Sequence, residues 1–112
     1  LWAKEGHVKM RKFGFEGLSE VLEGLKGKPV YFTLDLDVLD PSVFPGTGTP
    51  EAGGVSFQEL LQAVLLVAKN ARIVGCDVNE LSPPYDQSGV STAVAGKIVR
   101  ELLIALGNRL EV

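Results

Sequence analysis

Phe32–Pro41, FTLDLDVLDP, places three aspartates in a stretch that otherwise has the composition of a buried strand. Its alternation predicts a strand over residues 30–37, with Asp35 and Asp37 on the same face. A carboxylate in such surroundings costs free energy unless a cation or hydrogen-bond donors compensate it. Because parallel sheets bind ligands at the carboxyl ends of their strands, we predict that Asp35 and Asp37 hold Mg²⁺ or Mn²⁺.

A second strand also ends in acidic residues. Residues 71–78, ARIVGCDV, form a short apolar run, which predicts a strand covered on both faces with Cys76 as a small core residue. Asp77 and Glu80 follow at its end. Two consecutive strands that deliver carboxylates to one edge of a sheet favour a functional site.

A structural explanation of the first three aspartates is also consistent with their spacing. In that interpretation Asp35 and Asp37 lie on the exposed face of an edge strand. Asp40, which precedes Pro41, would then only shape a turn. D-x-D is a short pattern, so spacing alone leaves both interpretations open.

The rest of the chain predicts alternating helices and strands. Apolar residues spaced at helical intervals predict helices over about 18–25, from Ser56 onward and over about 91–106. Ser56 and Glu59 form a capping-box pattern that marks the start of the middle helix. Residues 41–54, rich in proline and glycine, and residues 79–89 are predicted loops. This order indicates a parallel α/β arrangement, and two strands alone make a poor sheet.

Composition limits the classes of function. The chain has 112 residues, 46% of them hydrophobic, and a net charge of −3 without a basic block, which argues against a nucleic-acid surface. No apolar run is long enough to cross a membrane, and no signal peptide is recognisable. The single cysteine excludes a disulfide framework within the chain. We therefore expect one domain without an internal boundary over residues 1–112, located in the cytoplasm.

The sequence resembles a known family. Residues 33–54, TLDLDVLDPSVFPGTGTPEAGG, resemble the S-x-D-x-D-x-x-D-P…P-G-T-G-T-P…G-G signature of the ureohydrolases, which include arginases and agmatinases. Residues 75–102 are similar to the closing segment of that family, and most similar to archaeal-type agmatinases. The resemblance implies part of a three-layer α/β/α domain with a mainly parallel, arginase-like sheet. The fold would be incomplete in this chain, which would be the carboxyl-terminal portion of the domain.

The resemblance also implies roles for individual residues. Asp35 would bridge the two ions of a binuclear Mn²⁺ centre, and Asp37 would bind one of them. Glu80 would hold the guanidinium group of the substrate, and Thr49 would lie near the pocket wall. Asp40 and Asp77 would support the site or shape a turn. The implied reaction is hydrolysis of a guanidino substrate, with agmatine to putrescine and urea preferred. Thr33 and Asn79 depart mildly from the family pattern.

The other motifs of the family are missing from this sequence. The histidine-containing G-G-D-H and D-A-H-x-D motifs do not occur, and His7, in EGHVKM, matches neither. Because ions of this kind need about six ligands, we expect the chain alone to be inactive. Its expected partners are a missing amino-terminal portion or further copies in a trimer or hexamer. The start at Leu1 fits a fragment.

Two other functions are compatible with parts of the pattern. A haloacid-dehalogenase-type phosphatase also has a D-x-D motif after an apolar strand, but the long P-G-T-G-T-P loop has no place in it. Alternatively, the chain would be a non-catalytic or degenerate subunit that binds a catalytic partner through its unpaired strand edges.

Overall fold

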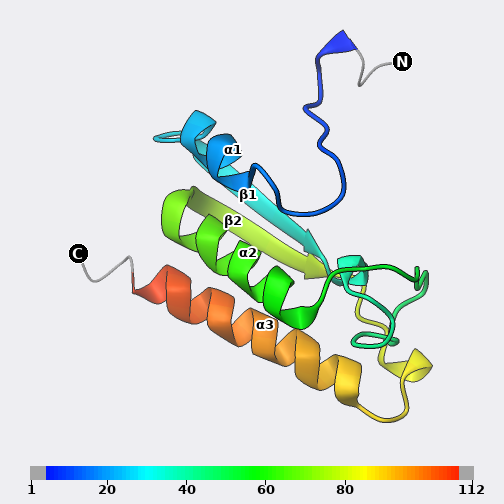
Figure 1. Cartoon of the computed structure of the whole chain (residues 1–112). Helices are drawn as coiled ribbons and strands as arrows, with labels where there is room; N and C mark the ends of the chain where they lie inside the picture. The colour runs from blue at the N-terminus through cyan, green and yellow to red at the C-terminus, as the bar shows by residue number, and fades with distance from the viewer. Residues whose placement is uncertain (1–4, 109–112) are drawn as a thin grey trace.

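The structure, a computed structural model, describes residues 5–108. Helices and strands alternate in the predicted order (Figure 1). They are α1 (Leu18–Gly24), β1 (Pro29–Asp35), α2 (Phe57–Asn70), β2 (Arg72–Asn79) and α3 (Val90–Gly107), with short 3₁₀ turns at Leu36–Val38 and Pro83–Tyr85. The predicted capping box is confirmed: Ser56 accepts a hydrogen bond from the Glu59 backbone, and the Glu59 side chain accepts one from Ser56. No helix among residues 5–108 is long and apolar enough to cross a membrane.

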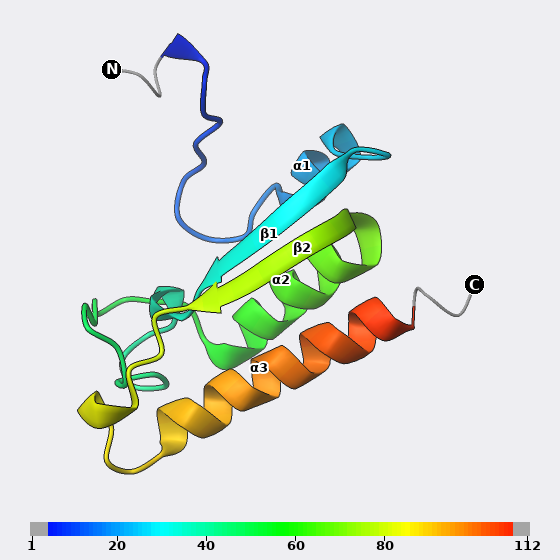
Figure 2. The same cartoon turned by 180° about the vertical axis from the view of Figure 1, so that it is seen from behind.

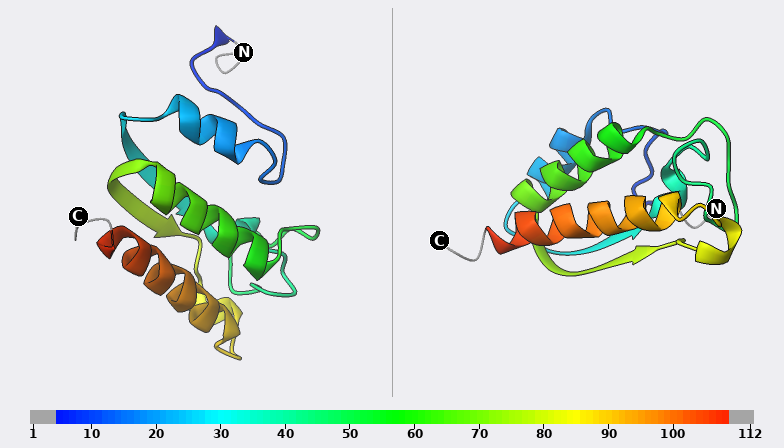
Figure 3. Two further views of the ribbon diagram at one scale, coloured as in Figure 1. Left: turned by 60° about the vertical axis from the view of Figure 1, so that its left-hand side comes forward. Right: turned by 90° about the horizontal axis from the view of Figure 1, so that it is seen from below.

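The two strands form a parallel sheet that the elements of residues 5–108 cover on one face only. Residues pair from Pro29 with Arg72 to Asp35 with Asn79, with one irregularity after Val30. Seen from behind, the strands lie in front of all three helices, and the view from below shows the helices on one side of the sheet (Figures 2 and 3).

The prediction that both faces of β2 are covered is therefore wrong for the described part of the chain. Val74 is 61% exposed, and Cys76, which the sequence suggested as a core residue, is also exposed. The reason is that no other element of residues 5–108 packs on the outer side of this strand.

The core lies between the covered face of the sheet and helices α2 and α3. It also includes parts of the long loop after β1: Phe44 is fully buried, and Leu39 and Val55 form a parallel bridge that closes the loop. The loop is thus packed against the body of the domain. The main cluster comprises Leu34, Leu36, Leu39, Phe44, Val55, Leu60, Val64, Ala68, Ala95, Ile98 and Leu102.

Strand β1 ends two residues earlier than the alternation predicts. The strand stops at Asp35, and Leu36–Val38 form a 3₁₀ turn in which the Leu39 N–H donates to the Leu36 carbonyl at 3.1 Å. In a 3₁₀ turn residues i and i+3 lie above one another, so both leucines reach the core, where they are 0% and 1% exposed. A continued strand would have turned Leu39 outward. Asp37 therefore lies on a turn and not on the face of the strand.

Candidate active site

The carboxyl ends of both strands meet at one edge of the sheet. The strand arrowheads in Figure 1 point to the same end of the molecule, where the loops after β1 and β2 gather. Asp35 is the last residue of β1 and pairs in register with Asn79, the last residue of β2, so Glu80 follows directly at this edge. The structure thus brings the chain positions of Asp35, Asp37 and Glu80 to one place, although their roles stay predictions.

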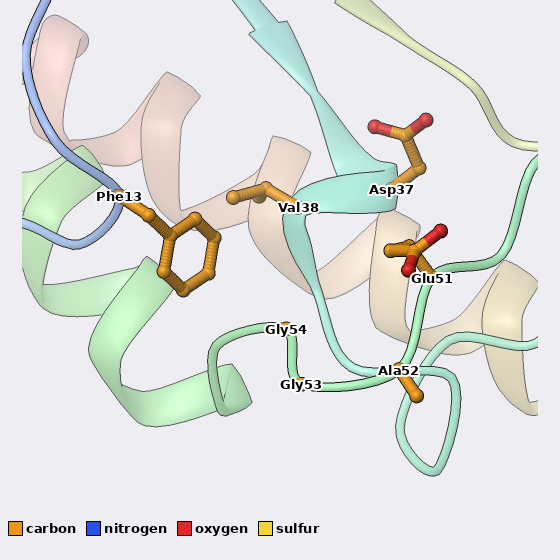
Figure 4. Close-up of a pocket in the computed structure, with 7 residues that line it drawn as sticks. All are labelled: Phe13, Asp37, Val38, Glu51, Ala52, Gly53 and Gly54. Atoms are coloured by element: carbon orange, nitrogen blue, oxygen red, sulfur yellow. The ribbon is translucent and has the colours of Figure 1, made fainter.

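Asp37 lines a pocket and is held by Thr49. The Thr49 hydroxyl donates to Asp37 Oδ2 at 3.2 Å, which places Thr49 next to the predicted ligand. The pocket has a volume of about 240 Å³, and the Asp37 and Glu51 carboxylates lie on one side of it and the Phe13 ring on the other (Figure 4). Phe13 and Glu51 were not anticipated, because their meeting depends on the path of two loops.

Asp77 is occupied by donors from both strands. Its carboxylate accepts hydrogen bonds from the Thr33 hydroxyl at 2.6 Å, the Tyr31 hydroxyl at 2.8 Å and the Asn79 amide. These donors, Thr33 first, stabilise the charged form and lower the pKa of Asp77. The same contact raises the pKa of Tyr31. Asp77 therefore links the two strands just before the edge that carries Asp35 and Glu80.

Glu80 has an unusual backbone conformation. Its φ of 74° makes it the only residue other than glycine with a positive φ among residues 5–108. Residues with a side chain rarely adopt this left-handed conformation, and such strain is concentrated at functional sites. This conformation occurs directly after the end of β2, and Glu80 is exposed at this edge of the sheet.

Asp40 closes the neck of the loop that follows β1. One carboxylate oxygen accepts from the backbone and hydroxyl of Ser42, and the other accepts from the Gly53 N–H at 2.9 Å. These donors, Ser42 first, lower the pKa of Asp40 to about 2. Gly54 passes so close that a Cβ there would lie 2.4 Å from the Asp40 nitrogen, so a side chain would not fit.

A second aspartate, Asp86, organises the turn before helix α3 in a similar way. Asp86 accepts from the Ser88 hydroxyl at 2.5 Å and from the Ser91 N–H at 2.8 Å, and these serines lower its pKa to about 2. Sequence reasoning assigned no role to Asp86. The pattern D-x-S-x-x-S is a local signal for such a turn and would have identified it.

The described residues do not form a complete metal site. Asp35 and Asp37 offer hard carboxylate oxygens, which suit divalent ions such as Mn²⁺. Within residues 5–108, however, no group of three or more histidine, cysteine, aspartate or glutamate side chains is arranged to hold an ion. His7 lies before α1, where its ring is 3.7 Å from the Glu5 carboxylate. The two carboxylates thus have suitable donor chemistry for such an ion, but the described residues alone do not surround one.

Comparison with known proteins identifies the class of protein. The model of the arginase family matches residues 5–105, and the chain belongs to this family. It is 49% identical to the agmatinase of Bacillus anthracis over 105 residues, which are 92% of this chain and 36% of that protein. The chain therefore spans about a third of the length of this relative.

Two further similarities extend this result. The mitochondrial guanidino acid hydrolase of Homo sapiens is 40% identical over 89 residues, which cover 80% of this chain and 25% of that protein. The crystal structure of a candidate agmatinase from Clostridium difficile superimposes with a TM-score of 0.88 at 47% identity, over 96% of this chain and 40% of that one. The fold is thus a portion of the arginase-type α/β domain.

Proposed function

We propose that this chain forms part of an enzyme that hydrolyses a guanidino substrate, with agmatine as the preferred substrate. The observation that carries the proposal is the edge of the sheet, where Asp35, Asp37 and Glu80 lie at the carboxyl ends of two adjacent parallel strands in a chain of the arginase family. The proposal covers the complete protein, because the chain spans 36% of a similar agmatinase.

Each side chain has a distinct task in this proposal. Glu80 accepts paired hydrogen bonds from the planar guanidinium group, for which a carboxylate is the matching acceptor. Asp35 and Asp37 hold divalent ions, and the Thr49 hydroxyl fixes the orientation of Asp37. Asp77 holds the two strands together just before these residues.

The reaction is a hydrolysis at the guanidinium carbon. Water adds to this carbon, the bond from the carbon to the substituted nitrogen breaks, and the amine leaves with a proton while urea forms. Bound divalent ions would make water a nucleophile at neutral pH. Two carboxylates are too few for such a centre, so we propose that the remaining ligands come from an amino-terminal portion or from another copy in a homo-oligomer. Mn²⁺ is the proposed metal.

The first experiment determines activity and substrate. The polypeptide that carries this chain in its source cells would be purified, loaded with Mn²⁺ and assayed for urea with agmatine, arginine and 4-guanidinobutyrate. We expect most urea from agmatine, and none from the isolated 112-residue chain. No urea from any of the three substrates in a manganese-loaded, folded protein would contradict the proposal and favour a non-catalytic subunit.

Two substitutions in the complete protein separate the proposed roles. Asp35→Asn should lower both manganese content and turnover, because it removes a charged ligand. Glu80→Gln should keep manganese but raise KM by about 10-fold or more, because a charge-assisted hydrogen bond to the guanidinium group is lost. Metal analysis and steady-state kinetics measure both, with Glu23→Gln on α1 as the matched control. Loss of manganese in Glu80→Gln would show that its assigned role is wrong.

The phosphatase alternative receives no support from the comparisons, in which the matched family is that of the arginases. We therefore do not propose it.

A further inference from the structure

The peptide of Gly46 joins the two loops of the candidate site. Its carbonyl accepts a hydrogen bond from the Ser82 N–H at 2.7 Å, and its N–H donates to the Ser91 hydroxyl at 2.8 Å. Gly46 belongs to the loop after β1, whereas Ser82 and Ser91 flank the turn between β2 and α3. The bridge therefore connects segments that are 36 and 45 residues apart in the chain.

The contact between Gly46 and Ser91 is closely fitted. A Cβ on Gly46 would lie 2.7 Å from the Ser91 Cβ and 3.1 Å from the Asp86 Cβ, so only glycine allows this approach. Ser91 is 0% exposed, and its own N–H donates to Asp86. A buried hydroxyl at the start of a helix thus serves as the acceptor for a backbone N–H of another loop.

The bridge reaches both halves of the candidate site. Three residues after Gly46, Thr49 donates to the predicted ligand Asp37. Ser82, on the other side of the bridge, lies two residues after Glu80. Without this contact, the loop whose Thr49 holds Asp37 could shift relative to the loop that begins with Glu80.

We propose that Ser91 is a positioning residue that couples the loop of Asp37 to the loop of Glu80. The proposal rests on the proposed function for its effect on catalysis. A guanidinium group held by Glu80 reacts only if its carbon lies correctly relative to the ions held by Asp35 and Asp37. An error of about 1 Å in such a distance costs about 100-fold in rate. Binding to Glu80 alone depends much less on this distance.

The test compares Ser91→Ala with Ser88→Ala in the complete, manganese-loaded protein. Ser88 lies in the same turn and also donates to Asp86, but its side chain is bonded within the turn, so it is a matched control. For Ser91→Ala we expect kcat to fall by about 10- to 100-fold while KM changes by less than about 3-fold. Calorimetric titration with methylguanidinium should still give one site per chain. Ser88→Ala should retain wild-type kcat.

Several outcomes would overturn the proposal. A fall in the number of methylguanidinium sites that matches the fall in kcat would mean that Ser91→Ala only reduces the folded fraction. Equal losses in both variants would assign the effect to the turn. Amide hydrogen exchange provides a readout without turnover: Ser91→Ala should speed exchange in peptides from both 44–49 and 80–86. If the wild-type protein releases no urea, the proposed function fails, and exchange that changes in only one of these loops separately refutes the coupling.

Discussion

At the scale of single residues, Asp40 and Asp86 couple stability to pH. Asp40 and Asp86 each have a pKa of about 2, lowered from 3.8 by hydrogen bonds from serines and backbone N–H groups that favour the charged form. A folded-state pKa below the unfolded value contributes stability that is present above the unfolded pKa. This stability is lost as the pH falls from about 4 to about 2.

This loss of stability at low pH leads to the first prediction. The thermal midpoint of the complete protein should decrease between pH 4 and pH 2, and Asp40→Asn should reduce this decrease while lowering the midpoint at pH 7. Ser42→Ala, which removes the largest cause of the shift, should give an intermediate result. Melting curves by circular dichroism at four pH values measure the effect. An unchanged pH dependence in Asp40→Asn would show that the hydrogen bonds to Asp40 do not contribute to the loss of stability at low pH.

The residue patterns in the sequence identified some of these positions and missed others. D-P with a serine after it is a local signal, so Asp40 could be interpreted as a turn residue before the structure was known. The link from Asp77 to Tyr31 and Thr33 requires the register of two strands, which are 44 or more residues apart. The contact between Gly46 and Ser91 has no local signal, because packing of two loops creates it.

At the scale of elements, Gly75 lets a side chain cross from one strand to the next. A Cβ at Gly75 would lie 2.9 Å from the Tyr31 ring, whose hydroxyl reaches Asp77 on β2. The ring can therefore lie across β2 only because position 75 has no side chain. This contact is part of the link between the strands near the candidate site.

Two glycine substitutions should have opposite effects. Gly75→Ala should destabilise the protein, because the Tyr31 ring must move and its bond to Asp77 is weakened. Gly96→Ala should stabilise it by up to about 1 kcal/mol, because Gly96 lies inside α3, an added carbon would meet no atom within 4 Å apart from the backbone of its own helix, and alanine favours helix. Urea unfolding of the complete protein measures both free energies. A stabilising Gly75→Ala would show that the ring is not constrained as described.

Element order could be predicted from the sequence, whereas one element end could not. Helical spacing of apolar residues and alternation in the strands are local patterns, and the structure confirms their order. Strand β1 ends at Asp35 because Leu36 and Leu39 are both buried in the core. A 3₁₀ turn places both leucines there, whereas continued strand alternation would not. The prediction that both faces of β2 are covered was wrong for residues 5–108, because an apolar composition does not show which segment of the chain would cover the strand.

At the scale of the whole molecule, the described segment leaves apolar side chains of the sheet exposed. Tyr31 is 64% and Val74 is 61% exposed, and within residues 5–108 the sheet has two strands with an open edge on each side. Parallel sheets are normally buried on both faces, and open edges pair readily with other chains. The described segment thus exposes apolar side chains and strand edges that are usually covered in parallel sheets.

This surface leads to a prediction for the isolated 112-residue chain. It should self-associate at micromolar concentration, and Val74→Lys should reduce this association because a charge on an exposed strand opposes pairing. Leu103→Lys on α3, at a position 60% exposed, is the matched control and should have less effect. Sedimentation velocity measures the distribution of species. Equal effects of both substitutions would indicate that the sheet does not direct the association.

The neck formed by Asp40 and Gly53 has a consequence for protein engineering. Because the Gly53 N–H donates to Asp40, the ends of this loop are held together, and its exposed tip at Glu51 and Ala52 lies beside the pocket that contains Asp37. A flexible insertion at this tip would add little to the entropy cost of closing the loop, since each doubling of a flexible length costs only about 0.6 kcal/mol. A recognition segment grafted there would extend over the pocket while the fastened ends keep the remainder of the domain unchanged.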